Sequence, residues 1–386
     1  MASPVATAMF LLAVLAVYGG FHAYFYTKLR VALPLVPWTN ALIVILLLLL
    51  FFSPIIVRLA ERWGLELFAR ALAYIGYLWM GFLFLSVVTS LLLDSVGLLT
   101  GIARLISTRT NVPLLPAWLQ LLAPTLVAFS ISVYGWCEAK DVRLHYIEVP
   151  SAKILPTAVP LRIVQLSDLH LGLLIREERL RQVLALVQEA QPDILVFTGD
   201  LLDGQIDTMA GCAALLREVQ PPYGKWAILG NHEYYAGLTS AKTFLQEAGF
   251  TLLRGRAAAT AGIILAGLDD PTGTGYGTAA RKAAAALLTG LPADRFTVLL
   301  AHQPIVYKEA RGRFDLQLSG HTHKGQIFPF NCITRLFFPY NSGFFRLGGG
   351  VYLYVSPGTG TWGPPLRFLA PPEVTVIDLV PAQGST

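Results

Sequence analysis

The sequence has little charge and no run of basic residues. Only 14% of its 386 residues are charged, 54% are hydrophobic, and the net charge of +5 is spread along the chain. This composition is too apolar for an ordinary soluble protein, so we expect part of the chain to lie in lipid. The absence of a basic run argues against a nucleic-acid partner.

Cysteine is also scarce. The three cysteines, Cys137, Cys212 and Cys332, lie far apart in the sequence, and none of them is part of a C-x-x-C motif. An odd number of cysteines with this spacing argues against a disulfide framework. It also argues against a metal site built from thiolates.

Long apolar runs occupy the first third of the chain. Four windows meet or approach the length of about 20 residues that a helix needs to cross a bilayer core. They are residues 7–27, 40–57, 71–93 and 114–136, and the first three contain no Asp, Glu, Lys or Arg. The fourth contains Pro116, Gln120 and Pro124, which also fit a kinked span or a helix lying in the membrane interface. We expect a transmembrane domain of about four helices over residues 1–138.

The basic residues of the short loops predict the orientation of this domain. One side of the membrane would carry six basic residues, Arg58, Arg62, Arg70, Lys140, Arg143 and Lys153. The other side would carry four, Lys28, Arg30, Arg104 and Arg109. This bias favours a multi-pass protein of the inner (cytoplasmic) membrane with both termini, and the second half of the chain, on the cytoplasmic side. Lys28 and Arg30, directly after the first window, favour the opposite orientation.

Residues 139–386 alternate short apolar runs with helical patterns. Residues 177–190 have the apolar spacing of a helix that packs on a sheet, residues 278–288 predict a surface helix, and Thr239 or Ser240 is a candidate cap for another helix. Strands are predicted at 142–149, 161–166, 194–198, 226–229, 262–266, 297–301, 316–319, 352–355 and 374–379. We expect an α/β domain, an α+β sandwich with central mixed β-sheets.

Polar side chains follow five of these predicted strands, at the edge where open α/β sheets bind ligands. They lie in Ser167-Asp168-Leu169-His170, Gly199-Asp200, Gly230-Asn231-His232-Glu233, Ala301-His302 and Gly320-His321-Thr322-His323. Asp, Asn and His donors together suit Mn²⁺, Fe or Zn²⁺ and would be unusual for Ca²⁺. One ion rarely uses as many as seven donors of this kind, whereas two ions that share Asp200 as a bridge would use all seven. The glycines at 199, 230 and 320 are expected to allow close approach of the backbone.

The ordered set of motifs resembles the calcineurin-like metallophosphoesterase superfamily over about residues 162–379. The segment from Tyr354 to Phe368 further resembles the membrane-associated bacterial branch with YkuE-like and YaeI-like proteins, whereas Lys324 stands where that branch commonly has Gly. The resemblance implies one ion held by Asp168, His170, Asp200 and His323, and another held by Asp200, Asn231, His302 and His321. It leaves His232 free of metal as a proton donor or a cation against phosphoryl charge, with Asp200 and Asn231 as the other catalytic residues.

The expected reaction is hydrolysis of a phosphodiester or pyrophosphate by water, without a covalent enzyme intermediate. The membrane windows and the aromatic run at 328–345, predicted as an irregular loop, favour a phosphorylated lipid-linked substrate and contact with membrane lipid. This run would pack against the membrane domain, enter the interface or line an acyl groove. The resemblance implies UDP-2,3-diacylglucosamine of lipid A biosynthesis, on the cytoplasmic side. The alternatives are a prenyl pyrophosphate or a phospholipid, for which the catalytic domain could face the periplasm.

A hypothesis of another class is a non-catalytic membrane scaffold or lipid-binding module. Such a protein is expected to lose ligand residues, and the full set is present here. The sequence leaves the oligomeric state open.

Overall fold

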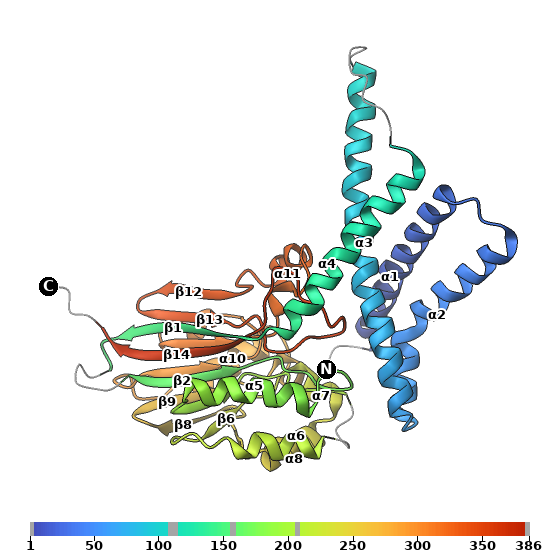
Figure 1. Cartoon of the computed structure of the whole chain (residues 1–386). Helices are drawn as coiled ribbons and strands as arrows, with labels where there is room; N and C mark the ends of the chain where they lie inside the picture. Colours follow the sequence, from blue (N-terminus) through green and yellow to red (C-terminus); the bar gives the residue numbers. More distant parts are fainter. Residues whose placement is uncertain (1–3, 107–114, 155–159, 205–208, 383–386) are drawn as a thin grey trace. The chain divides into compact units, whose positions relative to one another are not determined.

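The computed structural model describes residues 4–106, 115–154, 160–204 and 209–382. The chain divides into two compact units (Figure 1). The helical unit lies within Ala2–Cys137 and Gly363–Leu366, and the sheet unit lies within Glu138–Trp362 and Arg367–Thr386.

The helical unit contains four long helices. They are α1 (Pro4–Ala32), α2 (Pro37–Arg62), α3 (Glu66–Ile106) and α4 (Ala117–Lys140). Among the described residues, α2, α3 and α4 are long and apolar enough to cross a membrane. The first predicted window lies within α1, and its crossing stays a prediction. Residue 114 of the fourth window, and Arg109 of the orientation argument, lie outside the described residues.

Polar side chains connect α1 and α3 inside the helical unit. The Trp79 indole donates a hydrogen bond to Nε2 of His22 at 3.0 Å, and Nδ1 of His22 lies 2.9 Å from the carbonyl oxygen of Tyr18. The Tyr24 hydroxyl donates to Asp94 at 2.6 Å, and Lys28 forms an ion pair with the same carboxylate. Pairing of this kind reduces the cost of placing polar groups among apolar helices.

The sheet unit consists of two six-stranded mixed sheets and a two-stranded one. The first sheet runs in the order β1 (Arg143–Ser151), β14 (Glu373–Pro381), β2 (Leu161–Leu166), β4 (Ile194–Phe197), β6 (Lys225–Ala227), β7 (Thr251–Leu252). The second runs in the order β12 (Gly343–Gly348), β13 (Val351–Val355), β11 (Leu316–Ser319), β10 (Thr297–Leu300), β9 (Ile263–Gly267), β8 (Arg256–Thr260). The small sheet pairs β3 (Leu171–Gly172) with β5 (Leu202–Asp203).

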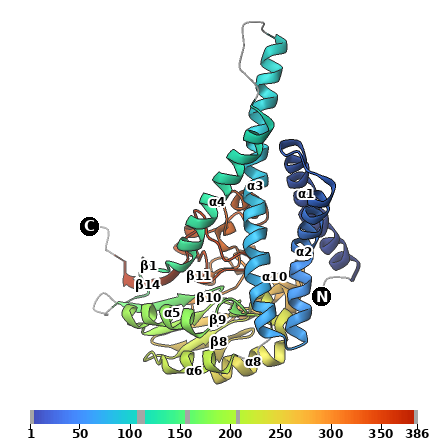
Figure 2. The same ribbon diagram turned by 45° about the vertical axis from the view of Figure 1, so that its right-hand side comes forward.

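Three apolar clusters hold the layers of the sheet unit together. One lies between the two large sheets and includes Ile163, Val196 and Val298. A second lies between the first sheet and the helices α5 (Glu177–Ala190), α6 (Ala210–Glu218) and α8 (Leu238–Glu247), which Figure 2 shows together on one side. A third joins the second sheet to α10 (Thr278–Leu288). The predicted sandwich with central mixed sheets is therefore confirmed.

Two local predictions were wrong. The residue that caps α8 is Gly237, and no side chain provides a cap hydrogen bond there, so Thr239 and Ser240 lie inside the first turn. The aromatic run is not an irregular loop, because it forms the helix α11 (Phe330–Phe337) and the strand β12. Pairing with β13 orders β12, although Pro and Gly flank both elements.

The remaining elements are α7 (Asn231–Ala236), α9 (Pro271–Thr274), η1 (Lys308–Ala310) and η2 (His323–Gly325).

Candidate metal centre

The predicted ligands meet at one edge of the sheet unit. Asp168, Asp200 and Asn231 follow β2, β4 and β6, which are neighbouring parallel strands of the first sheet. His302 and His321 follow β10 and β11, which are parallel neighbours in the second sheet. Because parallel strands end at the same edge, both sheets deliver polar side chains to a common place.

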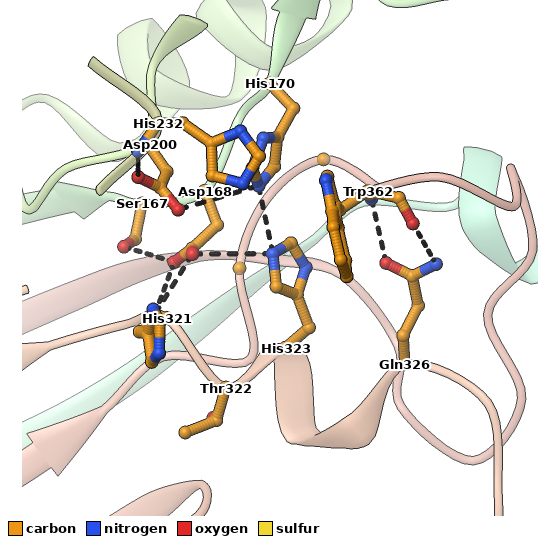
Figure 3. Close-up of polar contacts among 12 residues, drawn as sticks. Ser167, Asp168, His170, Asp200, His232, His321, Thr322, His323, Gln326 and Trp362 are labelled. Carbon is orange, nitrogen blue, oxygen red and sulfur yellow. Dashed lines mark hydrogen bonds and ion pairs between the residues drawn. The ribbon is translucent and has the colours of Figure 1, made fainter. Parts of the chain in front are cut away.

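Asp168, His170 and His323 form the first group of donors (Figure 3). The Nε2 atoms of the two histidines lie 3.0 Å apart, and Nε2 of His323 lies 3.4 Å from Oδ1 of Asp168. All three side chains are almost fully buried. Their donor atoms therefore point at one small volume that a cation would fill.

The second group consists of Asp200, His302 and His321. Nε2 of His302 lies 3.1 Å from Oδ2 of Asp200 and 3.2 Å from Nδ1 of His321. The amide oxygen of Asn231 also lies 3.2 Å from Nε2 of His302. Three donors of the types predicted for the second ion, from Asp200, Asn231 and His321, thus surround the Nε2 atom of His302.

Asp200 connects the two groups. Oδ2 of this carboxylate lies 4.0 Å from Nε2 of His170, in addition to its contact with His302. His170, Asp200 and His232 also lie close enough to hold an ion together. The carboxylate of Asp200 is 2% exposed, and its other oxygen, Oδ1, accepts the backbone N–H of His232 at 2.9 Å.

The contacts of His302 test whether these residues fit a metal ion. Nδ1 of His302 faces the carbonyl oxygen of Thr198 at 2.8 Å, and a carbonyl oxygen only accepts, so Nδ1 donates. In the neutral ring the lone pair of Nε2 then points at the oxygens of Asp200 and Asn231. Oxygen and nitrogen lone pairs that converge in this way repel one another unless a proton or a metal ion lies between them, and metal-ligating histidines commonly donate their other N–H to a carbonyl oxygen. The residues present therefore fit a divalent metal.

The pKa values of three histidines favour the same interpretation. Burial lowers the pKa of His170 to about 4 and that of His321 to about 3, with neighbouring imidazoles adding to the effect. Burial also lowers the pKa of His323 well below its ordinary value, helped by His170 and Arg367. These imidazoles are neutral at physiological pH, as metal ligation requires.

Asp200 and His302 are the charged pair at the centre of the site. Burial raises the pKa of Asp200, but the imidazoles of His302, His232 and His170 outweigh it and hold this pKa well below the usual range. Burial lowers the pKa of His302, whereas Asp200, Asp168 and Asp270 raise it well above the ordinary value. The negative charge of the cluster is therefore compensated by a proton on His302 or, when a metal ion is bound, by the charge of that ion.

The backbone around the donors is unusual. Asp168, Asp200 and His321 have φ values of 52°, 59° and 71°, in the left-handed region that residues other than glycine seldom adopt. The backbone N–H groups of Asp168 and His170 donate to the carbonyl oxygens of Gly199 and Asp200 at 3.0 Å and 3.1 Å. These hydrogen bonds tie the loops after β2 and β4 together and hold the side chains in place.

Gly320 shows the predicted close approach of the backbone. A Cβ atom on Gly320 would lie 2.1 Å from Oδ2 of Asp168, far inside van der Waals contact. The next residue, His321, donates its N–H to both oxygens of Asp168 at 3.0 Å. Any side chain at position 320 would displace the first group of donors.

The structure adds two acidic residues with roles that were not predicted. Asp203 lies 3.2 Å from Nδ1 of His232 through Oδ1. Glu233 is buried and accepts the backbone N–H groups of Gly230, Asp200, Leu201 and Leu202 at 2.7 to 3.1 Å. In the sequence, the signal that could have identified Asp203 is its position three residues after Asp200.

The segment after β13 supplies two further residues near the site. Arg367 is fully buried, and its guanidinium donates to the carbonyl oxygens of Pro357 and Ala370 at 2.7 Å and 3.1 Å and lies 3.3 Å from Nδ1 of His323. Trp362 is 53% exposed and its ring centroid lies 5.8 Å from that of His232. The side-chain amide of Gln326 donates a hydrogen bond to the carbonyl oxygen of Trp362 and accepts one from its backbone N–H, both at 2.9 Å (Figure 3). These two bonds fix the position of Trp362.

The comparisons with known proteins identify the family. A family model described as calcineurin-like phosphoesterase matches residues 161–325. A protein from Aquifex aeolicus, named as an uncharacterised metallophosphoesterase, is 38% identical over 255 residues, which cover 66% of this chain and 97% of that protein. The chain belongs to the calcineurin-like metallophosphoesterases.

Two further relatives are also named as metallophosphoesterases or for a metallophosphoesterase domain. YkuE of Bacillus subtilis, also named as an uncharacterised metallophosphoesterase, is 35% identical over 274 residues, which cover 64% of this chain and 90% of YkuE. A Danio rerio protein, named as a transmembrane protein with a metallophosphoesterase domain, is 33% identical over 277 residues. The match covers 67% of this chain and 62% of the Danio rerio protein. The predicted reaction class, hydrolysis of a phosphoester, is confirmed by the family.

Proposed function

We propose that this metallophosphoesterase is a two-metal enzyme of the cytoplasmic membrane that hydrolyses a phosphodiester or pyrophosphate bond in a lipid-linked substrate. The observation that supports the two-metal centre most directly is the position of Asp200. Its carboxylate belongs both to a donor group with His170 and to a donor group with His302 and His321. A shared carboxylate between adjoining groups is the arrangement of two-metal hydrolases.

The proposed ligands are those predicted from the sequence. One ion would be held by Asp168, His170, Asp200 and His323, and the other by Asp200, Asn231, His302 and His321. When bound, two divalent cations such as Mn²⁺, Fe or Zn²⁺ neutralise phosphate oxygens and make a water molecule acidic enough to attack phosphorus. Hydrogen bonds between the loops after β2 and β4 hold these donors in position.

His232 is proposed to donate a proton to the leaving oxygen. Burial lowers its pKa, but the hydrogen bond to Asp203 and the charge of Asp200 outweigh burial and raise the pKa above the ordinary value. The imidazolium form therefore persists to a higher pH than in free histidine. Because Asp203 contacts Nδ1, the Nε2 N–H is the one left to face substrate, and such a donor contributes about 10² to 10⁴ in rate.

The lipid-linked substrate rests on the candidate spans, and the cytoplasmic side rests on the basic residues of the short loops. The helices α2, α3 and α4 indicate membrane association, and β1 begins three residues after α4 ends. The sheet unit is thus tethered close to the bilayer that would contain a lipid substrate. UDP-2,3-diacylglucosamine on the cytoplasmic side is the first substrate to test, followed by a prenyl pyrophosphate and a phospholipid.

Metal analysis with a turnover assay tests the centre in the purified full chain. We expect Asp200→Asn to lose metal and hydrolysis of bis-p-nitrophenyl phosphate together, because it removes the shared carboxylate. His232→Asn should keep its metal and lose about 10² to 10⁴ in turnover. The exposed Asp294, changed to Asn, is the matched control and should behave as wild type.

Three outcomes would contradict parts of this proposal. Metal and activity retained in Asp200→Asn would refute the bridge. Metal lost in His232→Asn would make His232 a ligand, in line with its position beside His170 and Asp200. Full metal occupancy in the wild type with no hydrolysis of any ester or lipid pyrophosphate would support the non-catalytic scaffold.

A further inference from the structure

The helix α11 presents an apolar face to the outside of the sheet unit. Ile333, Leu336 and Phe337 are 46%, 80% and 73% exposed. Their spacing of three and four residues places them on one side of the helix. Exposed large apolar side chains are ordinary when they are scattered, but a group on one helix face marks an interaction surface. We call these three residues the outer face of α11.

Contacts of Thr334 and of Phe338, at the C-terminal end of α11, connect this helix to the loop that carries His321 and His323. Thr334 accepts a hydrogen bond from the amide of Asn341 at 2.7 Å, and the carbonyl oxygen of Asn341 accepts one from the hydroxyl of Thr322, between His321 and His323. Phe338, directly after the helix, has its ring centroid 4.9 Å from that of His321. The outer face therefore cannot turn inward without disturbing a proposed ligand loop.

The segment of the sequence that contains α11 carries charge of one sign. No Asp or Glu occurs between Asp315 and Glu373, although this stretch contains Lys324, Arg335, Arg346 and Arg367. Arg335 lies on α11 itself and Arg346 lies on β12, and both are exposed. Apolar residues accompanied by exposed arginines, without acidic residues, fit a surface of anionic phospholipid headgroups over acyl chains.

We propose that the outer face of α11 inserts into the headgroup and acyl boundary of the membrane that anchors this chain. The tether supports a bilayer as the partner, because Asp141 and Val142 are the only residues between α4 and β1. Each residue spans at most about 3.6 Å, so the sheet unit cannot leave the neighbourhood of the membrane. The inference rests on the proposed function and deepens it, because Phe338, directly after α11, contacts His321 of the proposed metal centre.

Depth-dependent quenching in bilayers tests this insertion. The full chain, with Cys137→Ser and Cys332→Ser, receives Leu336→Cys and a nitrobenzoxadiazole label, and is reconstituted in nanodiscs of phosphatidylcholine and phosphatidylglycerol. The matched control receives Tyr223→Cys instead, because Tyr223 is 47% exposed and precedes β6, at the end of the strand away from the metal centre. Lipids with a spin label in the upper acyl chain should strongly quench the label at 336 and leave the label at 223 bright.

The outcomes separate this inference from the proposed function. No quenching at 336, or equal quenching at 336 and 223, would overturn insertion of α11. Hydrolysis of soluble bis-p-nitrophenyl phosphate is measured on the same labelled proteins. Its absence in the wild type, together with no hydrolysis of any other ester or lipid pyrophosphate, would instead refute the proposed enzyme, whatever the label shows. Its retention in the Leu336→Cys protein shows that the fold and the metal centre are intact.

Discussion

At the scale of single residues, Asp203 controls the charge on His232. Its carboxylate lies 3.2 Å from Nδ1 of the imidazole and raises the pKa of His232 against the effect of burial. If the imidazolium donates a proton, activity falls as pH rises through this raised pKa. Asp203→Asn removes the charge and lowers the pKa, so the alkaline limb of kcat/KM should move to lower pH.

The pH profile with bis-p-nitrophenyl phosphate measures this shift. We expect the limb to move by about one pH unit, which corresponds to about 1.4 kcal/mol of interaction. Metal content should be unchanged, and Asp294→Asn serves as the control with the same change of charge on the surface. An alkaline limb that does not move in Asp203→Asn would show that another group sets it.

The positions of the site residues could be predicted from the sequence, but their geometry could not. Strand ends and motif spacing place Asp168, Asp200 and His302 at one edge, and the structure brings them together. The left-handed backbone at Asp168 and Asp200 leaves no trace in residue type, because neither is glycine. The same holds for Arg367, which looks like a surface residue in the sequence and is fully buried behind His323.

At the scale of elements, Glu233 fastens α7 to the loop between β4 and β5. Its carboxylate accepts four backbone N–H groups, from Gly230, Asp200, Leu201 and Leu202. In Glu233→Gln the amide nitrogen cannot accept, so two of these buried donors lose their partner. We expect a loss of about 2 to 4 kcal/mol in the free energy of unfolding.

Denaturant unfolding of the full chain in detergent measures this loss. The exposed Glu247 of α8, changed to Gln, is the matched control and should stay within about 0.5 kcal/mol of wild type. Equal stability of Glu233→Gln and Glu247→Gln would mean that the four hydrogen bonds contribute little to the fold. Bound metal should be removed first, since it stabilises the folded state separately.

The strands that sequence patterns predict best are the buried ones. Every predicted strand is present in the two large sheets, and β2 and β11 have the predicted bounds. The strands that were missed include β7, β8 and β12, which lie at sheet edges. An edge strand is half exposed, so β8 is built from Arg256, three alanines and Thr260 and has no apolar signal. Pairing with β9 gives it its structure.

At the scale of the whole molecule, the length of α3 exceeds what one crossing needs. The helix has 41 residues, or about 60 Å at 1.5 Å per residue, whereas a bilayer core is about 30 Å thick. The predicted window at 71–93 therefore covers only the central part of the helix. Hydropathy locates an apolar window within a helix but does not show where the helix ends, because hydrogen bonding continues beyond the lipid.

The number of crossings decides on which side of the membrane the two termini lie. Four crossings, by α1 to α4, place both termini on the same side, whereas three crossings, by α2 to α4 alone, place them on opposite sides. We expect green fluorescent protein fused at either terminus to fluoresce, and alkaline phosphatase at either terminus to be inactive, since both termini are predicted in the cytoplasm. Active phosphatase only at the N-terminus would show that α1 does not cross. Active phosphatase at the C-terminus would place the metal centre outside the cytoplasm and refute UDP-2,3-diacylglucosamine as the substrate, while leaving the phosphoesterase chemistry untouched.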